Sequence, residues 1–290
     1  MHQAIEWGKQ FRINNKKWLS ERIFSMWIEA PDIAQAFRPG QFVIVRINEL
    51  GERVPLTIAG VDDGKTQIHL VVQAVGYTTQ TMGQLNISDY LMDVVGPLGR
   101  PVEIHKYSAP ILGVAGGVGA APILPQLQAY REAGNEIIVV LGAKSEDQLL
   151  LVDELKKVAH QLHIITDDGS SGRKGLVTHM VTELLDNGLK PAHMIAIGPP
   201  IMMKFTCELA VQRGIPVMAS LNPIMVDGTG MCGGCRVTVG DKTYFACVDG
   251  PDFDGSQVNW NEMMSRLGTY TAQEKQVLEH NCGIGLGRTN

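Results

Sequence analysis

The residues of this chain best suited to chemistry are three cysteines, Cys232, Cys235 and Cys247, and an aspartate that precedes them, Asp227. Their spacing is D-x4-C-x2-C-x11-C. Thiolates and carboxylates both bind metal ions. The glycine-rich sequence around the first two cysteines allows a tight loop whose N–H groups point inward. The sequence RVTVGDKTYFAC after Cys235 predicts a hairpin that returns Cys247 to the other candidate ligands.

The spacing favours a [2Fe–2S] cluster. The plant-type cluster loop reads C-x4-C-x2-C…C, and this chain matches it if Asp227 takes the place of the first thiolate. Zinc bound to a C-x2-C pair and cysteines without a ligand remain as alternatives. A disulfide is not expected, because nothing in the sequence is typical of a secreted protein. For Asp227 the alternative role is structural, since aspartate before glycine often caps a turn through its side chain.

Composition limits the class of protein. The 290 residues are enough for two or three domains, and 44% hydrophobic with 19% charged residues is ordinary for a soluble protein. A net charge of −5 argues against a nucleic-acid partner. The N-terminal sequence MHQAIEWGKQF lacks the apolar region of a secretory signal. The uncharged stretch from Tyr107 to Tyr130 is interrupted by glycines and prolines, so no membrane helix is expected there. We therefore expect a cytoplasmic protein.

The first part of the chain, to about residue 105, has the pattern of an all-β domain. Short runs rich in β-branched and aromatic residues are separated by turn sequences such as Arg38-Pro39-Gly40 and Asp62-Asp63-Gly64. This rhythm predicts a small Greek-key barrel. The expected strands are Glu21–Glu29, Gln41–Ile47, Gln67–Val75 and Tyr90–Val95.

Three motifs in this region resemble the flavin-binding barrel of the ferredoxin–NADP reductase superfamily. The sequence RVPLTI at 53–58 is similar to its R-x-P-[L/Y/F]-[S/T] signature, GYTT at 76–79 to its G-x-[S/T]-T turn, and GPLGRP at 96–101 to the turn that closes its barrel. The resemblance implies FAD, with Arg53 at the phosphates and Thr57 at the isoalloxazine ring. A surface arginine beside a strand proline is the alternative for the first motif. The implied flavin contacts are Arg53, Pro55, Leu56, Thr57, Ile58, Gly76, Thr78 and Thr79.

From about Ser108 the sequence alternates between apolar strands and helices, which predicts a parallel sheet with right-handed crossovers. The expected strands are Pro110–Ala115, Ile137–Leu141, His163–Thr166 and Met194–Ile197. The expected helices are one that runs to about Ala133 and those at Leu149–Ala159, Val177–Asp186 and Ile201–Arg213.

A glycine-rich loop, GGVGAAP at 116–122, joins the first of these strands to its helix. Main-chain N–H groups and the helix dipole favour a pyrophosphate at such a position. The loop resembles the G-x-G-[I/V]-[A/G]-x-P sequence with which ferredoxin reductases hold a nicotinamide dinucleotide, although a loop without a ligand is the alternative. The superfamily's C-G-P sequence at the last strand is kept here as Gly198-Pro199, with Ile197 in place of the cysteine. The implied contacts with NAD(H) are Gly116, Gly117, Val118, Gly119, Asp167, Asp168, Gly198 and Pro199.

The choice between NADH and NADPH depends on Asp167 and Asp168, which follow a predicted strand. Two carboxylates would repel a 2′-phosphate and suit free ribose hydroxyls. Arg173 and Lys174 lie a few residues further on and act in the opposite direction. The sequence predicts a preference for NADH.

With barrel, nucleotide domain and cysteine loop in this order, the chain is similar over nearly its whole length to two related families. One is the electron-transfer subunit of dihydroorotate dehydrogenase. The other, to which it is more similar, is the small (alpha) subunit of NADH-dependent ferredoxin:NADP oxidoreductase, also known as a sulfide dehydrogenase subunit. Asp227 separates the two, because the first family is expected to carry four cysteines and the second three cysteines and an aspartate. The implied domains are a flavin barrel at 1–106, a nucleotide domain at 107–222 and a cluster domain with a tail at 223–290.

The resemblance implies a subunit of an NADH-dependent, flavin-based and electron-bifurcating oxidoreductase. Electrons would pass between NAD(H), FAD and the [2Fe–2S] cluster to a larger flavoprotein and iron–sulfur subunit. No side chain is expected to act as a catalytic acid or base, because the chemistry belongs to the cofactors. The dihydroorotate dehydrogenase subunit and a non-catalytic module stabilised by zinc remain as alternatives. Of the other cysteines, Cys207 lies in a helical pattern and is expected to be buried, and Cys282 is expected to be a free thiol in the tail.

Overall fold

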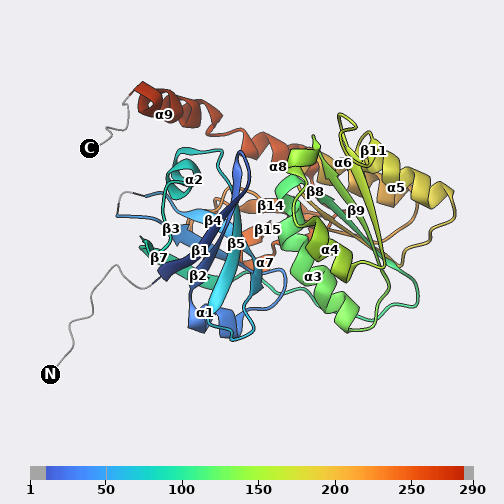
Figure 1. Cartoon of the computed structure of the whole chain (residues 1–290). Coiled ribbons are helices and arrows are strands. Elements are labelled where there is room, and N and C mark those ends of the chain that lie inside the picture. Colours follow the sequence, from blue (N-terminus) through green and yellow to red (C-terminus); the bar gives the residue numbers. More distant parts are fainter. Residues whose placement is uncertain (1–10, 50, 284–290) are drawn as a thin grey trace.

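The N-terminal part of the chain folds into a nearly closed antiparallel barrel (Figure 1). The computed structural model describes residues 11–49 and 51–283, with side chains up to residue 277. The strand order is β6-β1-β2-β5-β4-β3-β7, in which β2 pairs with β5 rather than with the next strand, as in a Greek key. The elements are β1 (Phe11–Ser20), β2 (Ile23–Glu29), α1 (Pro31–Ala36), β3 (Phe42–Arg46), β4 (Val54–Val61), β5 (Gln67–Gln73), α2 (Tyr77–Met82), β6 (Tyr90–Leu91) and β7 (Asp93–Leu98).

Alternation along the strands fills the barrel. Phe24, Met26 and Ile28 on β2 are fully buried, and Ile68 and Leu70 on the neighbouring β5 pack against them. The four strand runs expected from the sequence are confirmed as β2, β3, β5 and the β6–β7 pair. The sequence does not predict β1, because a single residue of that strand is fully buried and most of the others are polar.

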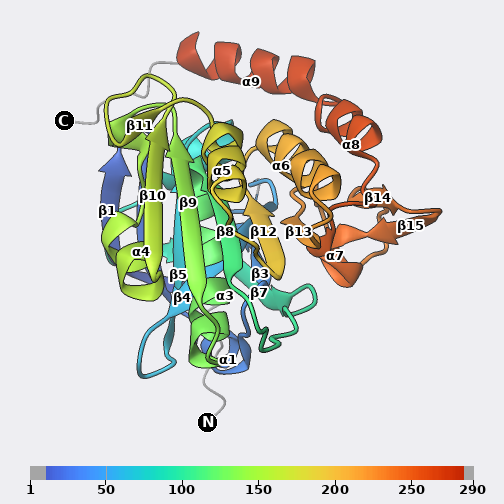
Figure 2. The same cartoon turned by 90° about the vertical axis from the view of Figure 1, so that its right-hand side faces the viewer.

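The second part is a seven-stranded sheet with the order β11-β10-β9-β8-β12-β13-β16. All of its pairs are parallel except β13 with β16 (Figure 2). Its elements are β8 (Ile111–Gly116), η1 (Gly117–Gly119), α3 (Ala120–Glu132), β9 (Ile137–Ala143), η2 (Glu146–Gln148), α4 (Val152–Val158), β10 (Gln161–Thr166), β11 (Arg173–Lys174), α5 (Val177–Asp186), β12 (His193–Ile197), α6 (Pro200–Gln212) and β13 (Val217–Ser220).

Helices cover both faces of this sheet, because its central strands are apolar on both sides. On β8, Leu112 and Val114 belong to a core with α5 and α6, whereas Ile111 and Ala115 belong to a core with α3 and α4. Cys207 of α6 is 1% exposed, as expected. Each predicted strand and helix of this part is confirmed within a few residues, and Val177–Asp186 is found with the predicted bounds.

The C-terminal part begins with the predicted hairpin, β14 (Arg236–Val239) and β15 (Lys242–Phe245), which ends in a short helix, α7 (Ala246–Asp249). The chain then returns to the large sheet, where β16 (Asp252–Asp254) pairs antiparallel with β13. It ends in α8 (Trp260–Leu267) and α9 (Thr271–Gly283), of which α9 contacts α2 of the barrel. The predicted domain limits at residues 106 and 222 stay a prediction, and the sheet contains strands from both sides of the second limit.

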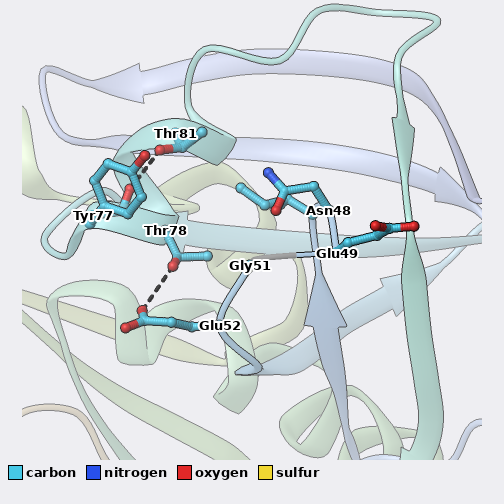
Figure 3. A pocket seen from close by; sticks show the side chains of 8 residues that line it. Asn48, Glu49, Gly51, Glu52, Tyr77, Thr78 and Thr81 are labelled. Carbon is cyan, nitrogen blue, oxygen red and sulfur yellow. Dashed lines mark hydrogen bonds between the residues drawn. The ribbon is translucent and has the colours of Figure 1, made fainter.

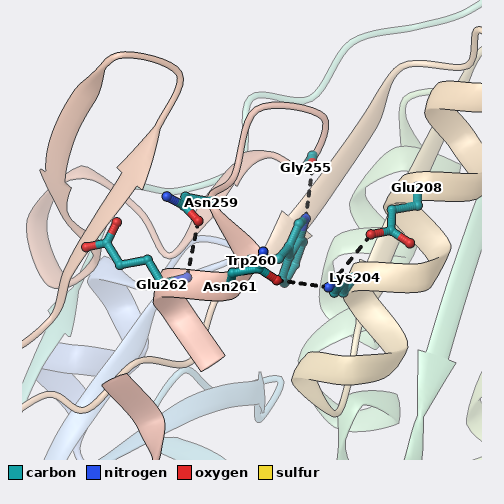
Figure 4. A network of polar contacts seen from close by, with 7 residues as sticks. All are labelled: Lys204, Glu208, Gly255, Asn259, Trp260, Asn261 and Glu262. Atoms are coloured by element: carbon teal, nitrogen blue, oxygen red, sulfur yellow. Dashed lines mark hydrogen bonds and ion pairs between the residues drawn. The ribbon is translucent and has the colours of Figure 1, made fainter. Parts of the chain in front are cut away.

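One hydrogen bond joins α8 to α6, and two others order the start of α8 (Figure 4). Lys204 of α6 donates to Asn261 Oδ1 at 3.1 Å, and the Trp260 indole N–H donates to the carbonyl of Gly255 at 3.3 Å. Asn259 caps α8 by accepting the N–H of Glu262. None of the helices in the described part of the chain is long and apolar enough to cross a membrane.

We expect Phe253→Ala to lower the free energy of unfolding by about 3 kcal/mol, because Phe253 is 9% exposed and anchors β16 in the shared apolar core. Urea denaturation followed by circular dichroism measures the change. The control is Val211→Ala on α6, where the side chain is 52% exposed and the expected loss is within about 0.5 kcal/mol. Equal losses in the two variants would contradict the anchoring role.

Candidate cofactor-binding sites

The candidate flavin site lies along β4 and at the start of α2. In β4, Pro55 is opposite Ile44 and Thr57 is opposite Phe42 of β3, while Arg53 is exposed just before the strand begins. Pro55 and Thr57 point to the same face of the strand and are only half-buried, so this face is open enough for a flat ring to lie against it, whereas Leu56 points the other way and packs against the barrel core. Ile58 is different from the other predicted contacts, since it is fully buried in the barrel core.

Two threonines of α2, Thr78 and Thr79, are held by polar contacts of their own, and Figure 3 shows the contact of Thr78. Thr78, which is 3% exposed, donates its hydroxyl to Glu52 Oε2 at 2.8 Å. The Thr79 hydroxyl accepts the N–H of Gly76 at 3.0 Å and donates to the carbonyl of the same residue. These contacts order the turn where the sequence predicts the flavin pyrophosphate. The sequence analysis did not single out Glu52, although its position directly before Arg53 was a usable signal.

A pocket of about 550 Å³ opens between this turn and the loop that follows β3. A volume of this size is typical of small-molecule sites. Its wall contains two carboxylates and an exposed tyrosine ring, Tyr77. The lining residues are Ile47, Asn48, Glu49, Gly51, Glu52, Tyr77, Thr78 and Thr81 (Figure 3).

The candidate nucleotide site lies where the strand order of the large sheet reverses. From β8 the chain continues outward through β9 and β10, and it then returns to place β12 on the other side of β8. In open α/β sheets, ligands bind outside the carboxyl ends of the strands at this switch point. The glycine loop at 116–119 follows β8, and Gly198 follows β12, so the two predicted segments meet there.

Close packing explains why these segments are rich in glycine. A Cβ atom at Gly119 would lie 2.1 Å from the carbonyl oxygen of Ile197, and one at Gly198 would lie 3.0 Å from the carbonyl oxygen of Gly116. Gly117 has a φ of +53°, and the space where its Cβ would stand is open. The loop is therefore closed against β12 on one side and open on the other, beside the N-terminus of α3. This arrangement fits a bound pyrophosphate.

The two aspartates expected at the adenosine end follow β10 and are exposed. Asp168 accepts the hydroxyl of Ser170 at 2.7 Å and its N–H at 2.9 Å, and these bonds lower the pKa of Asp168. Its negative charge is therefore well maintained. Arg173 forms an ion pair with Glu183 of α5, which partly neutralises the cation that could have attracted a 2′-phosphate.

In the cysteine loop the four predicted ligands lie in contact as two pairs, Cys235 with Cys247 and Asp227 with the main chain of Cys232. Cys235 and Cys247 are each 1% exposed, and their sulfur atoms lie 3.1 Å apart. Cys232 is exposed and accepts the N–H of Gly234 at 3.4 Å, while Cys235 accepts the N–H of Cys247 at the same distance. Main-chain N–H groups directed at sulfur are a feature of cluster loops, so this donor set fits an iron–sulfur cluster.

Asp227 lies in this loop as an acceptor of main-chain hydrogen bonds. Its Oδ1 accepts the N–H of Thr229 at 3.0 Å and its Oδ2 accepts the N–H of Cys232 at 2.9 Å, which lowers the pKa of Asp227. Burial raises the pKa of Cys247 to about 12, and a bound metal would remove its proton. Among the residues that the structure describes, no three His, Cys, Asp or Glu side chains converge on a site for a single metal ion. The ligand role of Asp227 stays a prediction.

The loop also docks on the barrel. A Cβ atom at Gly228 would lie 2.7 Å from the Cδ1 atoms of Ile44 and Leu98, so the loop backbone touches β3 and β7 directly. The turn that follows β7 makes a second contact, because the N–H of Arg100 donates to the carbonyl of Gly250 at 2.6 Å. The cysteine loop is thus held against β3, which pairs with β4, and against β7 on the other side of β3.

Comparisons with known proteins agree with this architecture. Residues 114–208 match an oxidoreductase NAD-binding domain, and residues 222–259 match the iron–sulfur cluster binding domain of dihydroorotate dehydrogenase B. The fold and sites define an NAD-binding oxidoreductase of the ferredoxin-reductase type, with FAD, an iron–sulfur cluster and NAD(H) as its cofactors. The match to an iron–sulfur domain decides against the zinc alternative.

The chain belongs to the family of electron-transfer subunits of dihydroorotate dehydrogenase B. It is 48% identical over 263 residues to the homologue of this subunit from Thermotoga maritima, with 91% of this chain and 92% of the relative covered. A probable subunit of the same kind from Methanocaldococcus jannaschii is 36% identical over 77% of this chain and 82% of its own length. A chain from the structure of an NADH-dependent reduced ferredoxin–NADP oxidoreductase, studied for flavin-based electron bifurcation, is 44% identical. It has a TM-score of 0.89, over 97% of this chain and all of that one.

We expect Arg53→Ala to weaken flavin binding by roughly tenfold to a hundredfold, because a charge-assisted hydrogen bond to a phosphate contributes about 1.5–3 kcal/mol. Flavin fluorescence after gel filtration measures retention. Arg22→Ala, which removes an exposed arginine from a different turn of the barrel, is the matched control and should retain flavin like the parent. Retention by Arg53→Ala equal to that of the control would refute the phosphate role.

We expect Asp227→Cys to keep the cluster and to shift its electron paramagnetic resonance spectrum toward that of an all-thiolate ferredoxin, because a soft ligand replaces a hard one. Iron content measured on the same samples shows whether the cluster is retained. Asp227→Asn is the control for the turn, since its amide oxygen can still accept one of the two N–H groups. An unchanged spectrum with full iron content in Asp227→Cys would show that Asp227 caps the turn and does not bind iron.

Proposed function

We propose that this chain is the small electron-transfer subunit of a flavin-based, electron-bifurcating oxidoreductase of the NADH-dependent ferredoxin:NADP type. It would connect NAD(H), FAD and a [2Fe–2S] cluster with a larger flavoprotein and iron–sulfur subunit. The observation that supports this most is the likeness, over 97% of this chain and all of the other, to a chain from the oxidoreductase of known structure. The presence of Asp227 where a fourth cysteine is expected in dihydroorotate dehydrogenase subunits supports the same choice.

When bound, FAD accepts electrons in pairs and can release them singly, whereas an iron–sulfur cluster carries one electron at a time. The tasks of the chain itself are binding and orientation. The N–H groups at 117–119 and the N-terminus of α3 would hold the dinucleotide pyrophosphate. Arg53 would hold the flavin phosphates, and the open face of β4 around Thr57 would support the ring. The fixed contacts between cysteine loop and barrel would keep the cluster at a constant distance from the flavin.

A second candidate is the electron-transfer subunit of a dihydroorotate dehydrogenase, because the curated relatives carry that description. The two candidates differ in the partner that they require. Copurification of the tagged chain with its native partner, followed by assays with dihydroorotate and with reduced ferredoxin plus NADP, separates them. Dihydroorotate-dependent reduction of NAD by the purified complex would favour the second candidate.

The proposal is tested on protein purified without oxygen. We expect absorption from both flavin and iron–sulfur cluster, with equal amounts of iron and acid-labile sulfide, and bleaching of the spectrum after addition of NADH. A colourless protein, or one whose spectrum does not respond to either nicotinamide dinucleotide, would refute the proposed function. The cytoplasmic location expected from the sequence stays a prediction.

We expect NADH to reduce the flavin faster than NADPH in stopped-flow experiments, because Asp167 and Asp168 oppose a 2′-phosphate. Asp168→Asn should narrow the preference by about fivefold, which corresponds to about 1 kcal/mol for a solvated charge pair. Asp153→Asn removes an equally exposed acid from α4 and should leave the ratio unchanged. Equal or faster reduction of the parent by NADPH would remove the argument from the two aspartates.

A further inference from the structure

Two side chains joined by one hydrogen bond, Gln126 and Asp252, each carry a second, buried oxygen atom without a hydrogen-bond partner. Gln126 of α3 donates its amide N–H to Asp252 Oδ2 of β16 at 3.1 Å. The second oxygen of each of these groups, Gln126 Oε1 and Asp252 Oδ1, is shielded from solvent and has no partner among the described residues. Both atoms are acceptors while Asp252 is ionised, so they cannot bond to each other. One proton on the carboxyl group would provide the missing donor.

The pair lies where all three parts of the chain meet. Gln126 belongs to the helix that begins at the glycine loop, and Asp252 belongs to the strand that follows the cysteine loop. From the barrel, Gly40 approaches so closely that a Cβ atom there would lie 2.9 Å from Asp252 Oδ2. Ser220 of β13 also acts on the carboxyl group and lowers its pKa. This contact therefore links the nucleotide helix, the cluster segment and the barrel.

The surroundings of Asp252 are poor in charge. Tyr130, one turn along α3 from Gln126, is a titratable group that faces it, and its own pKa is raised mainly by burial. Arg38 and Glu103, on the barrel turn and the following linker, are exposed, as is Asp254 on β16 itself. Burial raises the pKa of Asp252 to about 6, against the opposing effect of hydrogen bonds from Ser220 and Gln126.

We propose that Asp252 and Gln126 form a proton-binding site that positions α3. With a proton on Oδ1, Asp252 donates to Gln126 Oε1 while Gln126 donates to Asp252 Oδ2, and the two side chains close a ring of two hydrogen bonds. Without the proton, one of these bonds is lost and a buried carboxylate remains at the junction of the three parts. An unsatisfied buried charge weakens such a contact. The junction is therefore tightest when Asp252 is neutral.

The sign of the pH dependence follows from the raised pKa. Between the unfolded value of 3.8 and the folded value of about 6, the folded chain binds a proton that the unfolded chain has lost. The contribution to stability is complete below pH 3.8, is lost as the pH rises toward 6, and is absent above that. Over this interval the folding equilibrium constant should fall by up to about tenfold per pH unit, which is the effect of one bound proton.

Infrared spectroscopy on the intact holoprotein tests the proposal without any use of NADH, so its outcome is independent of the proposed function. We expect the C=O stretching band of a protonated carboxylic acid, which shifts when aspartate is labelled with carbon-13 and titrates near pH 6. Asp252→Asn should lack this band while keeping both hydrogen bonds to Gln126 through its amide. Asp254→Asn, the same change two residues along the strand, should retain the band.

Denaturation across the pH range provides the second readout. The folding equilibrium constant of the parent, divided by that of Asp252→Asn, should fall with pH as derived above. The same quotient of the parent and Asp254→Asn should not show this fall, because both proteins contain Asp252. If Asp252→Asn folds poorly, the infrared spectrum of the labelled parent still decides the test. A spectrum of the parent at pH 5 without a labelled carboxylic-acid band would overturn the proposal, as would a band that persists in Asp252→Asn.

Discussion

One apolar core joins the three parts of the molecule, and the placement of every candidate site depends on it. Phe42 and Ile44 of the barrel, the apolar face of β8 and β9, and the buried pair Cys235 and Cys247 belong to the same set of packed residues. A second core joins Ile23 of the barrel to α3 and the opposite face of the sheet. Protein interiors are packed as densely as organic crystals and transmit displacement. The three sites are therefore held relative to one another by side-chain packing rather than by linkers.

The strand order of the sheet adds a second constraint. Because β12 lies beside β8 although three strands and three α-helices separate them along the chain, the loops after both strands open at one edge. Only glycine allows the backbones of these loops to approach as closely as Gly119 approaches Ile197. The nucleotide loop is thus shaped by the carbonyl of its neighbour as much as by its own sequence. The open side that results is the side facing a ligand.

Much of this architecture could be predicted from local sequence. The glycine loop, the hairpin after the cysteines and the helix Val177–Asp186 all show short-range signals, namely glycine spacing, alternation and helical periodicity. Among the strands that were not predicted, β1 and β16 show two different reasons. β1 buries only Ile13 and reads as polar, and β16 is three residues long and forms because β13 offers an unpaired edge. The bond from Thr78 to Glu52 and that from Gln126 to Asp252 also join residues far apart in sequence, where no spacing rule applies.

The pairing of β13 with β16 has an entropic consequence for the cysteine loop. All four predicted ligands lie in the segment between these strands, and the pairing brings the two ends of that segment together. The loss of chain entropy that accompanies loop closure is therefore offset by the strand pairing in the sheet and not by metal binding. In metal-binding loops whose ends are not paired, the metal–ligand bonds must offset this loss of entropy. Such loops therefore unfold when the metal is removed. In this chain the two ends of the segment are held by the pairing of β13 with β16. The backbone around the cysteines can therefore fold before the cluster is inserted.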